Sequence, residues 1–152
     1  MSDVSAPTFP PRLNHVAITM PPGELDDAGR AQIKDFYGDV FEWFEGDNSG
    51  ESGNPLILMT GQMQFVYLLP GDPALECPRL DHFGLEVSSV AEIEEIVAKA
   101  KTWQEKDDRV QIIDVKARSS EGPRGQYVLT SAYVGFLLPM MVELQHLHVE
   151  LA

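Results

Sequence analysis

The chain has 152 residues, which suits one domain or two small fused modules and is enough to bury a hydrophobic core. Asp and Glu number 24 against 11 Lys and Arg, so the formal net charge is −13 at pH 7. This charge argues against a nucleic-acid partner, because the phosphate backbone would be repelled. No stretch is long and apolar enough to predict a membrane span, so we expect no membrane partner.

The composition indicates a folded, cytoplasmic protein. Hydrophobic residues make up 43% of the chain and aromatic residues 9%, so the acidity belongs to a globular protein and not to a disordered acidic tail. The single cysteine, Cys77, permits no internal disulfide bond. The first dozen residues lack the basic start and apolar run of a secretory signal, so we expect a cytoplasmic location.

A repeat follows the proline-containing segment 1–12, which is expected to be a flexible arm. LNHVAITM at 13–20 and LDHFGLEV at 80–87 align without a gap, with His15 opposite His82. Each run has the apolar character of a strand and leads through a short polar connection into a segment with helical spacing. The sequence therefore predicts two copies of one supersecondary unit.

The first module spans about 13–69. After its first strand, a helix is predicted over about 27–44, where apolar residues recur three and four apart: Ile33, Phe36, Tyr37, Val40, Phe41 and Phe44. Runs rich in β-branched and aromatic residues then predict strands at 55–60 and 63–69, with a further strand expected around 41–47. The turn-rich segment 70–79 connects this module to the next.

The second module spans about 80–148 and repeats the same order. Ser89 and Glu92 have the spacing of a capping box, and the apolar stripe after them predicts a helix over about 90–105. Later runs predict three strands, at 110–117, 126–134 and 139–146. The fold class is therefore predicted to be α+β, with two modules of strand, helix and three strands in one domain over 13–152.

Two loops stand out by composition. Gly, Ser and Pro are concentrated in GDNSGESGNP at 46–55 and in RSSEGPRG at 118–125. Segments of this kind carry few packing constraints, so we expect both to be mobile and able to close over a ligand.

The two matched histidines and one glutamate are the main functional signal. A single histidine on a half-apolar strand is more often structural than a metal ligand. Because His15 and His82 occupy matching positions in two repeats, we give the structural and the ligand interpretations equal weight. Strand alternation places Glu143 on one face with Met141 and Gln145, where it either points to solvent or is neutralised by a metal. Two imidazoles and one carboxylate hold Fe, Mn, Ni, Co or Zn with coordination positions left open.

These features resemble the vicinal oxygen chelate superfamily of glyoxalase, bleomycin resistance protein and extradiol dioxygenase. The resemblance covers about 13–146 and rests on the repeated element order and on LNHVAI, KDFYGDVFEWFEG, DHFGLEV and VELQH. It implies a glyoxalase-like domain in which two βαβββ modules form a curled mixed sheet, a half-barrel with the helices outside. It also implies that His15, His82 and Glu143 are metal ligands, and that the chain pairs as a homodimer whose site can take ligands from both chains.

Two tyrosines are catalytic candidates within this resemblance. Aligning MQFVYLL with PMMVELQ puts Tyr67 opposite Glu143, where a bacterial-type glyoxalase I would show a glutamate ligand; neither Tyr67 nor the nearby Gln64 is one. Tyr133 lies ten residues before Glu143, a spacing at which extradiol dioxygenases carry a tyrosine beside the substrate. In this chain, however, GFLLPMM stands in place of their usual Pro-Ser-Gly turn. The set of acid/base residues of a dioxygenase is therefore incomplete.

Other members of the superfamily fit less well. Fosfomycin-modifying transferases resemble one another in a threonine two residues after the first histidine, where this chain has Ala17. Relatives of methylmalonyl-CoA epimerase would need basic residues for the CoA phosphates, and a chain at −13 supplies few. The resemblance therefore favours three-ligand members and leaves the reaction unassigned.

Three further residues are candidates for substrate binding. Arg118 and Arg124 flank the second loop and could clamp a substrate carboxylate, although loop arginines are usually just solvated. Tyr127 could donate a hydrogen bond to a bound oxyanion, with packing as the alternative.

The leading hypothesis is a divalent-metal enzyme, of isomerase, lyase or oxygenase type, acting on a small oxygen-chelating organic substrate. One alternative is a metal-free acidic protein that sequesters a cationic drug, as bleomycin resistance proteins do, because the net charge attracts a polycation. A third hypothesis is a non-catalytic interaction protein that retains a vestigial metal site.

Overall fold

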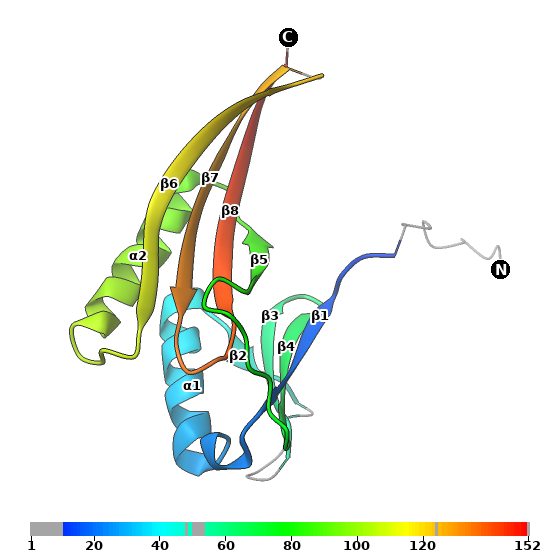
Figure 1. Cartoon of the computed structure of the whole chain (residues 1–152), viewed down its shortest axis with the longest axis vertical. Coiled ribbons are helices and arrows are strands. Elements are labelled where there is room, and N and C mark those ends of the chain that lie inside the picture. Colours follow the sequence, from blue (N-terminus) through cyan, green and yellow to red (C-terminus); the bar gives the residue numbers. More distant parts are fainter. Residues whose placement is uncertain (1–10, 48, 50–53, 124, 152) are drawn as a thin grey trace, which may run out of the picture.

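The computed structural model describes residues 11–47, 49, 54–123 and 125–151. Two modules with the same element order lie along the chain (Figure 1). The first contains β1 (His15–Met20), a 3₁₀ turn η1 (Pro22–Glu24), α1 (Asp27–Phe41), β2 (Phe44–Glu45), β3 (Leu56–Gly61) and β4 (Gln64–Pro70). The second contains β5 (His82–Glu86), α2 (Val90–Gln104), β6 (Gln111–Gly122), β7 (Gly125–Gly135) and β8 (Met141–Leu151).

Each module forms its own four-stranded mixed sheet. The strand orders are β1-β4-β3-β2 and β5-β8-β7-β6, so β1 and β5 are equivalent outer strands. β1 pairs with β4 and β5 pairs with β8 in parallel, while the remaining pairs are antiparallel. The predicted α+β class with two βαβββ modules is confirmed. The described strands of one chain form two curled sheets and no closed barrel.

Local signals explain where the helices begin and end. The Asp26 carboxylate caps α1 by accepting from the backbone N–H of Gly29, and the Ser89 hydroxyl caps α2 by accepting from that of Glu92. α1 ends at Phe41 because Glu42 has a φ of 60°, in the left-handed region, so the helix predicted over 27–44 is three residues too long. No helix in the described part of the chain is long and apolar enough to cross a membrane.

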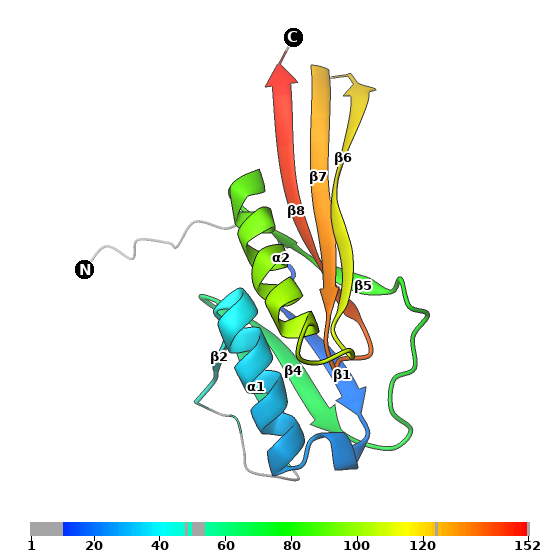
Figure 2. The same ribbon diagram turned by 90° about the vertical axis from the view of Figure 1, so that its left-hand side faces the viewer.

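Strand alternation gives the second sheet two different faces. Val142 and Leu144 of β8 and Ala132 of β7 are buried in the core, and Glu143 and Tyr133 alternate to the other side. Figure 2 shows both helices on one side of the strands. We call the opposite side of the second sheet its open face; it carries His82, Lys116, Arg118, Leu129, Ser131, Tyr133, Glu143, Gln145 and Leu147.

A buried hydrogen bond joins the two modules. The Tyr37 hydroxyl of α1 donates to the carbonyl oxygen of Phe136 at 3.0 Å and accepts from its N–H at 3.3 Å. The Phe36 ring packs on Phe136 and edge-on to Trp103, whose Nε1–H donates to Asp39 at 2.6 Å. Helix α1 is therefore tied to the end of β7 and to α2 through both polar and aromatic contacts.

The prediction of a loop at 118–125 is wrong. β6 continues to Gly122 and β7 begins at Gly125, so all but the turn of this segment belongs to a long hairpin. Backbone pairing runs from Arg118 opposite Leu129 down to the turn. Ser, Gly and Arg keep their backbone N–H groups, so a polar composition does not prevent a ladder when a partner strand is present.

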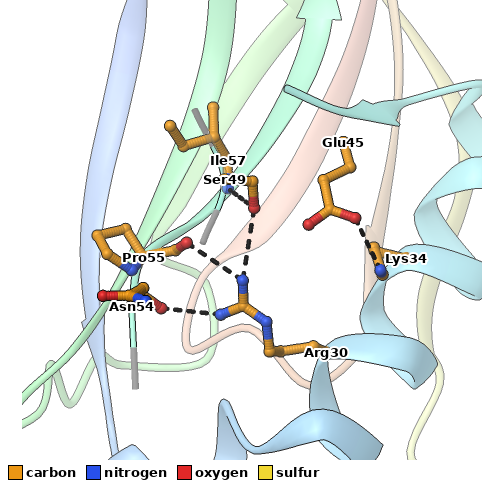
Figure 3. Close-up of polar contacts among 7 residues, drawn as sticks. All are labelled: Arg30, Lys34, Glu45, Ser49, Asn54, Pro55 and Ile57. Carbon is orange, nitrogen blue, oxygen red and sulfur yellow. Dashed lines mark hydrogen bonds and ion pairs between the residues drawn. The ribbon is translucent and has the colours of Figure 1, made fainter. Parts of the chain in front are cut away.

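A buried arginine holds the end of the other predicted loop. Arg30 of α1 is 4% exposed and donates to the carbonyl oxygens of Asn54 at 2.8 Å and Pro55 at 3.2 Å, and to the Ser49 hydroxyl at 3.4 Å (Figure 3). Ser49 Oγ also accepts from the N–H of Ile57. The mobility predicted for 46–55 concerns residues 48 and 50–53, which lie outside the described residues.

Candidate metal centre

A histidine and a glutamate meet on the open face of the second sheet. β5 begins at His82, and its parallel pairing with β8 places Gly84 opposite Glu143. Nε2 of His82 lies 3.2 Å from Oε2 of Glu143. The same carboxylate oxygen accepts from Nε2 of Gln145 at 2.8 Å, and Glu143 is only 5% exposed. The pair is thus an almost completely covered carboxylate beside a half-exposed imidazole.

The second nitrogen of His82 determines what the pair can hold. Nδ1 lies 2.7 Å from the carbonyl oxygen of Leu80, and a carbonyl only accepts, so Nδ1 carries the hydrogen. In the neutral ring, Nε2 then directs a lone pair at the lone pairs of Glu143. A hydrogen on Nε2 or a metal ion bound to both atoms would each remove this repulsion. Two adjacent ligands of a divalent metal are about 2.9 to 3.4 Å apart, which includes the separation seen here.

His15 has the same local arrangement in the first module. It begins β1, is exposed, and its Nδ1 lies 2.8 Å from Oδ1 of Asn14. Its ring stacks on Phe65 with centroids 4.9 Å apart and planes at 4°. With Nδ1 donating to the amide oxygen, Nε2 is left free as a ligand, and metal-binding histidines are usually oriented in this manner.

The structure brings together two of the three expected ligands within one chain. Among the residues described, no three His, Cys, Asp or Glu side chains are close enough to hold a metal together. The reason is topological, because His15 lies on the outer strand of the first sheet whereas His82 and Glu143 lie on two strands of the second. In the described residues of one chain, His15 therefore does not join the His82–Glu143 pair.

Tyr133 lies directly against the pair. It is opposite Glu143 in the β7–β8 ladder, and its ring meets His82 edge-on at 5.0 Å between centroids. A hydrogen bond to Glu143, with partial burial, raises the pKa of the Tyr133 phenol above its ordinary value. The hydroxyl therefore stays protonated at neutral pH and is a donor at the carboxylate.

Tyr67 occupies the equivalent position in the first module. Ala17 of β1 is opposite Tyr67 of β4, just as Gly84 of β5 is opposite Glu143 of β8. The structure therefore confirms the alignment of Tyr67 with Glu143. Tyr67 shares its sheet face with His15, because alternate residues of paired strands point the same way.

Comparison with solved structures identifies the fold. Lactoylglutathione lyase from Agrobacterium tumefaciens superposes with a TM-score of 0.54 at 18% identity, covering 90% of this chain and 94% of that one. The fosfomycin resistance protein FosX from Listeria monocytogenes gives 0.55 at 15%, covering 90% and 91%. A glyoxalase/bleomycin resistance protein/dioxygenase from Nocardioides gives 0.50 at 17%, covering 91% and 85%. This chain has the vicinal oxygen chelate fold. No protein-family model and no curated protein matches its sequence.

Within this vicinal oxygen chelate fold, the three substrate-binding candidates have different positions. Arg118 lies exposed on β6, and its charge acts on the Tyr133 phenol, so the guanidinium is on the open face. Tyr127 is 36% exposed near the start of β7. Arg124 lies outside the described residues. Of the three, Arg118 is the one whose charge acts on Tyr133, the neighbour of His82 and Glu143.

Two residues support Glu143 in ways that sequence reasoning missed. Gln145 was expected on the same face, but its hydrogen bond to the carboxylate was not predicted; strand alternation over two residues was the available signal. Gly84 lies against the carboxylate: a Cβ there would be 3.6 Å from Oε2 of Glu143, an ordinary van der Waals contact.

A cavity of about 360 Å³ lies between the outer strands of the two modules. His15 lines it, whereas His82, Tyr133 and Glu143 do not. The described lining includes four aromatic residues and two carboxylates but no lysine or arginine; these six residues are Phe41, Trp43, Phe65, Phe83, Glu86 and Glu92. The cavity is therefore aromatic and acidic.

Proposed function

We propose that the protein is a divalent-metal-dependent enzyme, of isomerase, lyase or oxygenase type, that acts on a small oxygen-chelating organic molecule. The observation that carries the proposal is the 3.2 Å approach of Nε2 of His82 to Oε2 of Glu143 while Nδ1 donates to Leu80. A cation between these two atoms satisfies both. When bound, a divalent metal would polarise the oxygens of a chelating substrate.

The third ligand in this proposal is the partner's His15, in a homodimer. His15 is exposed on an outer strand and, in the described part of one chain, does not join the His82–Glu143 pair. A symmetric dimer would use the same surfaces twice and so would complete two equivalent sites. Because Tyr67 shares a sheet face with His15, a protomer that supplies one also brings the other to the site.

Tyr133 is the residue we assign to proton transfer. Its ring lies against His82 and its hydroxyl is hydrogen-bonded to Glu143, and a phenol keeps its hydrogen at neutral pH because the ordinary tyrosine pKa is about 10. A protonated phenol beside bound substrate can donate to an oxygen that gains negative charge. Tyr67, brought by the partner, is assigned a hydrogen bond to the same substrate.

Metal analysis of untagged protein tests the proposal. We expect about one divalent metal per chain, and loss of that metal in His82→Ala and Glu143→Gln. His146→Ala is the matched control, because His146 lies on the face opposite Glu143 and contacts the Val87 carbonyl. A native protein that contains no metal and takes up none of added Fe, Mn, Ni, Co or Zn would contradict the proposal.

The aromatic, acidic cavity between the modules favours a second candidate, a metal-free protein that sequesters a cationic drug. Aromatic faces and carboxylates attract an organic cation, and no described lysine or arginine opposes it. Titration with bleomycin, followed by tryptophan fluorescence, tests this candidate, because Trp43 lines the cavity. Binding that Glu86→Gln weakens and His82→Ala leaves unchanged would support it, and absence of binding would remove it.

A further inference from the structure

The open face of the second sheet continues beyond the metal-ligand candidates in a polar row. Gln145 of β8 is opposite Ser131 of β7, and Ser131 is opposite Lys116 of β6. Two residues further along β6 lies Arg118. A path thus leads from Glu143 across amide and hydroxyl groups to two cations on the neighbouring edge of the sheet.

Among the residues that the structure describes, Lys116 and Arg118 have no carboxylate partner. Both side chains are exposed, and neither Lys116 nor Arg118 forms an ion pair or hydrogen bond with any residue that the structure describes. By contrast, Lys34, Lys99, Lys101 and Arg109 are all paired with carboxylates. In a chain with 24 acidic residues against 11 basic ones, two unpaired cations on one sheet face are a distinct feature.

The distance between β8 and β6 sets the length of a ligand that could contact both Glu143 and the two cations. β8 and β6 are separated by one strand, so their backbones are about 10 Å apart. Lysine and arginine side chains shorten this gap from the β6 side, since their stems are long and flexible. A ligand held at His82 and Glu143 would therefore reach the cations through a chain of a few atoms.

The geometry points to a substrate that carries a second, distal carboxylate: an organic acid whose chelating oxygens lie at His82 and Glu143 and whose far carboxylate is bound by Lys116 and Arg118. This inference rests on the proposed function for the chelating end only. The guanidinium fork suits bidentate carboxylate binding and the ammonium adds a point charge, so the pair selects anions over neutral groups of equal size.

Two acids that differ only at the far end test the inference. 2-Oxoglutarate and 2-oxopentanoate share the same chelating 2-oxo acid group, but the first ends in a carboxylate and the second in a methyl group. We expect calorimetry on the metal-loaded dimer to show about tenfold tighter binding of 2-oxoglutarate, the difference that one well-formed charged contact supplies. Arg118→Gln and Lys116→Gln should each reduce this preference while leaving 2-oxopentanoate binding unchanged.

The control variant is Lys106→Gln, which removes an exposed charge just beyond the end of α2 and should leave the preference intact. Equal or absent binding of the two acids by the wild type, or a preference that survives both substitutions, would overturn the inference. The proposed function is tested separately, by the metal content of the wild type and of His82→Ala. A preference that depends on Arg118 but persists after metal removal would support the anion site and count against the metal enzyme.

Discussion

Oε2 of Glu143 receives the amide hydrogen of Gln145 at 2.8 Å on one side and faces Nε2 of His82 at 3.2 Å on the other. The amide fixes the direction of the carboxylate, so the lone pairs opposite His82 are held in place before any ligand arrives. Groups that orient a metal ligand in this way contribute to affinity without touching the metal.

Gln145→Leu should therefore weaken metal binding without abolishing it. We expect affinity for Zn²⁺ to fall by about 10- to 100-fold, because the carboxylate loses its orienting donor while both ligand atoms remain. Competition with a chromophoric chelator measures the affinity. Gln126→Leu, at an exposed position near the start of β7, is the matched control and should leave the affinity unchanged. Equal affinities of wild type and Gln145→Leu would show that the amide does not orient a ligand.

Mixing two inactive variants distinguishes a shared site from a site within one chain. His15→Ala and Glu143→Gln should each lose metal alone. If the partner supplies His15, a mixed dimer contains one intact site and one doubly defective site, so random exchange should restore roughly a quarter of the wild-type metal content. Metal analysis after co-refolding measures this recovery. No recovery, in a mixture shown to contain mixed dimers, would place all three ligands in one chain.

The repeat explains why much of the fold could be predicted. The alignment of His15 with His82, and of Tyr67 with Glu143, depends only on strand patterns within each module, and the two registers agree with it. Helix starts could also be predicted, since capping residues such as Ser89 act within one turn.

What the sequence could not predict depends on contacts between distant segments. The 118–125 segment has loop composition, but β7 supplies a partner for its backbone, and tertiary pairing outweighs local preference. The position of His15 relative to Glu143 depends on how two separate sheets and a second chain are arranged, which no local pattern encodes. The sequence did not mark Lys116 as a binding residue, because exposed lysines on strands are common and its neighbours on the sheet are not evident from the sequence.

Arg30→Gln should destabilise the protein by about 2 to 4 kcal/mol, because it removes a buried charged donor and leaves two carbonyl oxygens without a partner. Those oxygens belong to Asn54 and Pro55, ahead of β3. Urea unfolding followed by circular dichroism measures the change. Lys34→Gln, one helical turn away, is the control; its half-exposed ion pair with Glu45 is worth at most about 1 kcal/mol. Similar losses in the two variants would contradict the anchoring role of Arg30.

Tyr37→Phe should cost about 1 to 3 kcal/mol of unfolding free energy at pH 8, since the N–H and carbonyl of Phe136 lose their buried partner. The cost should also depend on pH. Burial raises the pKa of the Tyr37 phenol far above its ordinary value, so the folded state holds this proton more tightly than the unfolded state does. The stabilisation is then complete below the ordinary tyrosine pKa of about 10 and is lost as the pH rises above it.

The gap in unfolding free energy between wild type and Tyr37→Phe should therefore narrow by about 0.8 kcal/mol between pH 8 and pH 10.5, as measured by urea denaturation at each pH. The exposed Tyr127 provides the control, and Tyr127→Phe should stay within about 0.5 kcal/mol of wild type at pH 8. A gap between wild type and Tyr37→Phe that stays constant over this range would mean that the phenol ionises equally in both states. The hydroxyl would then be exposed to water, and the link from α1 to Phe136 would not hold the two modules together.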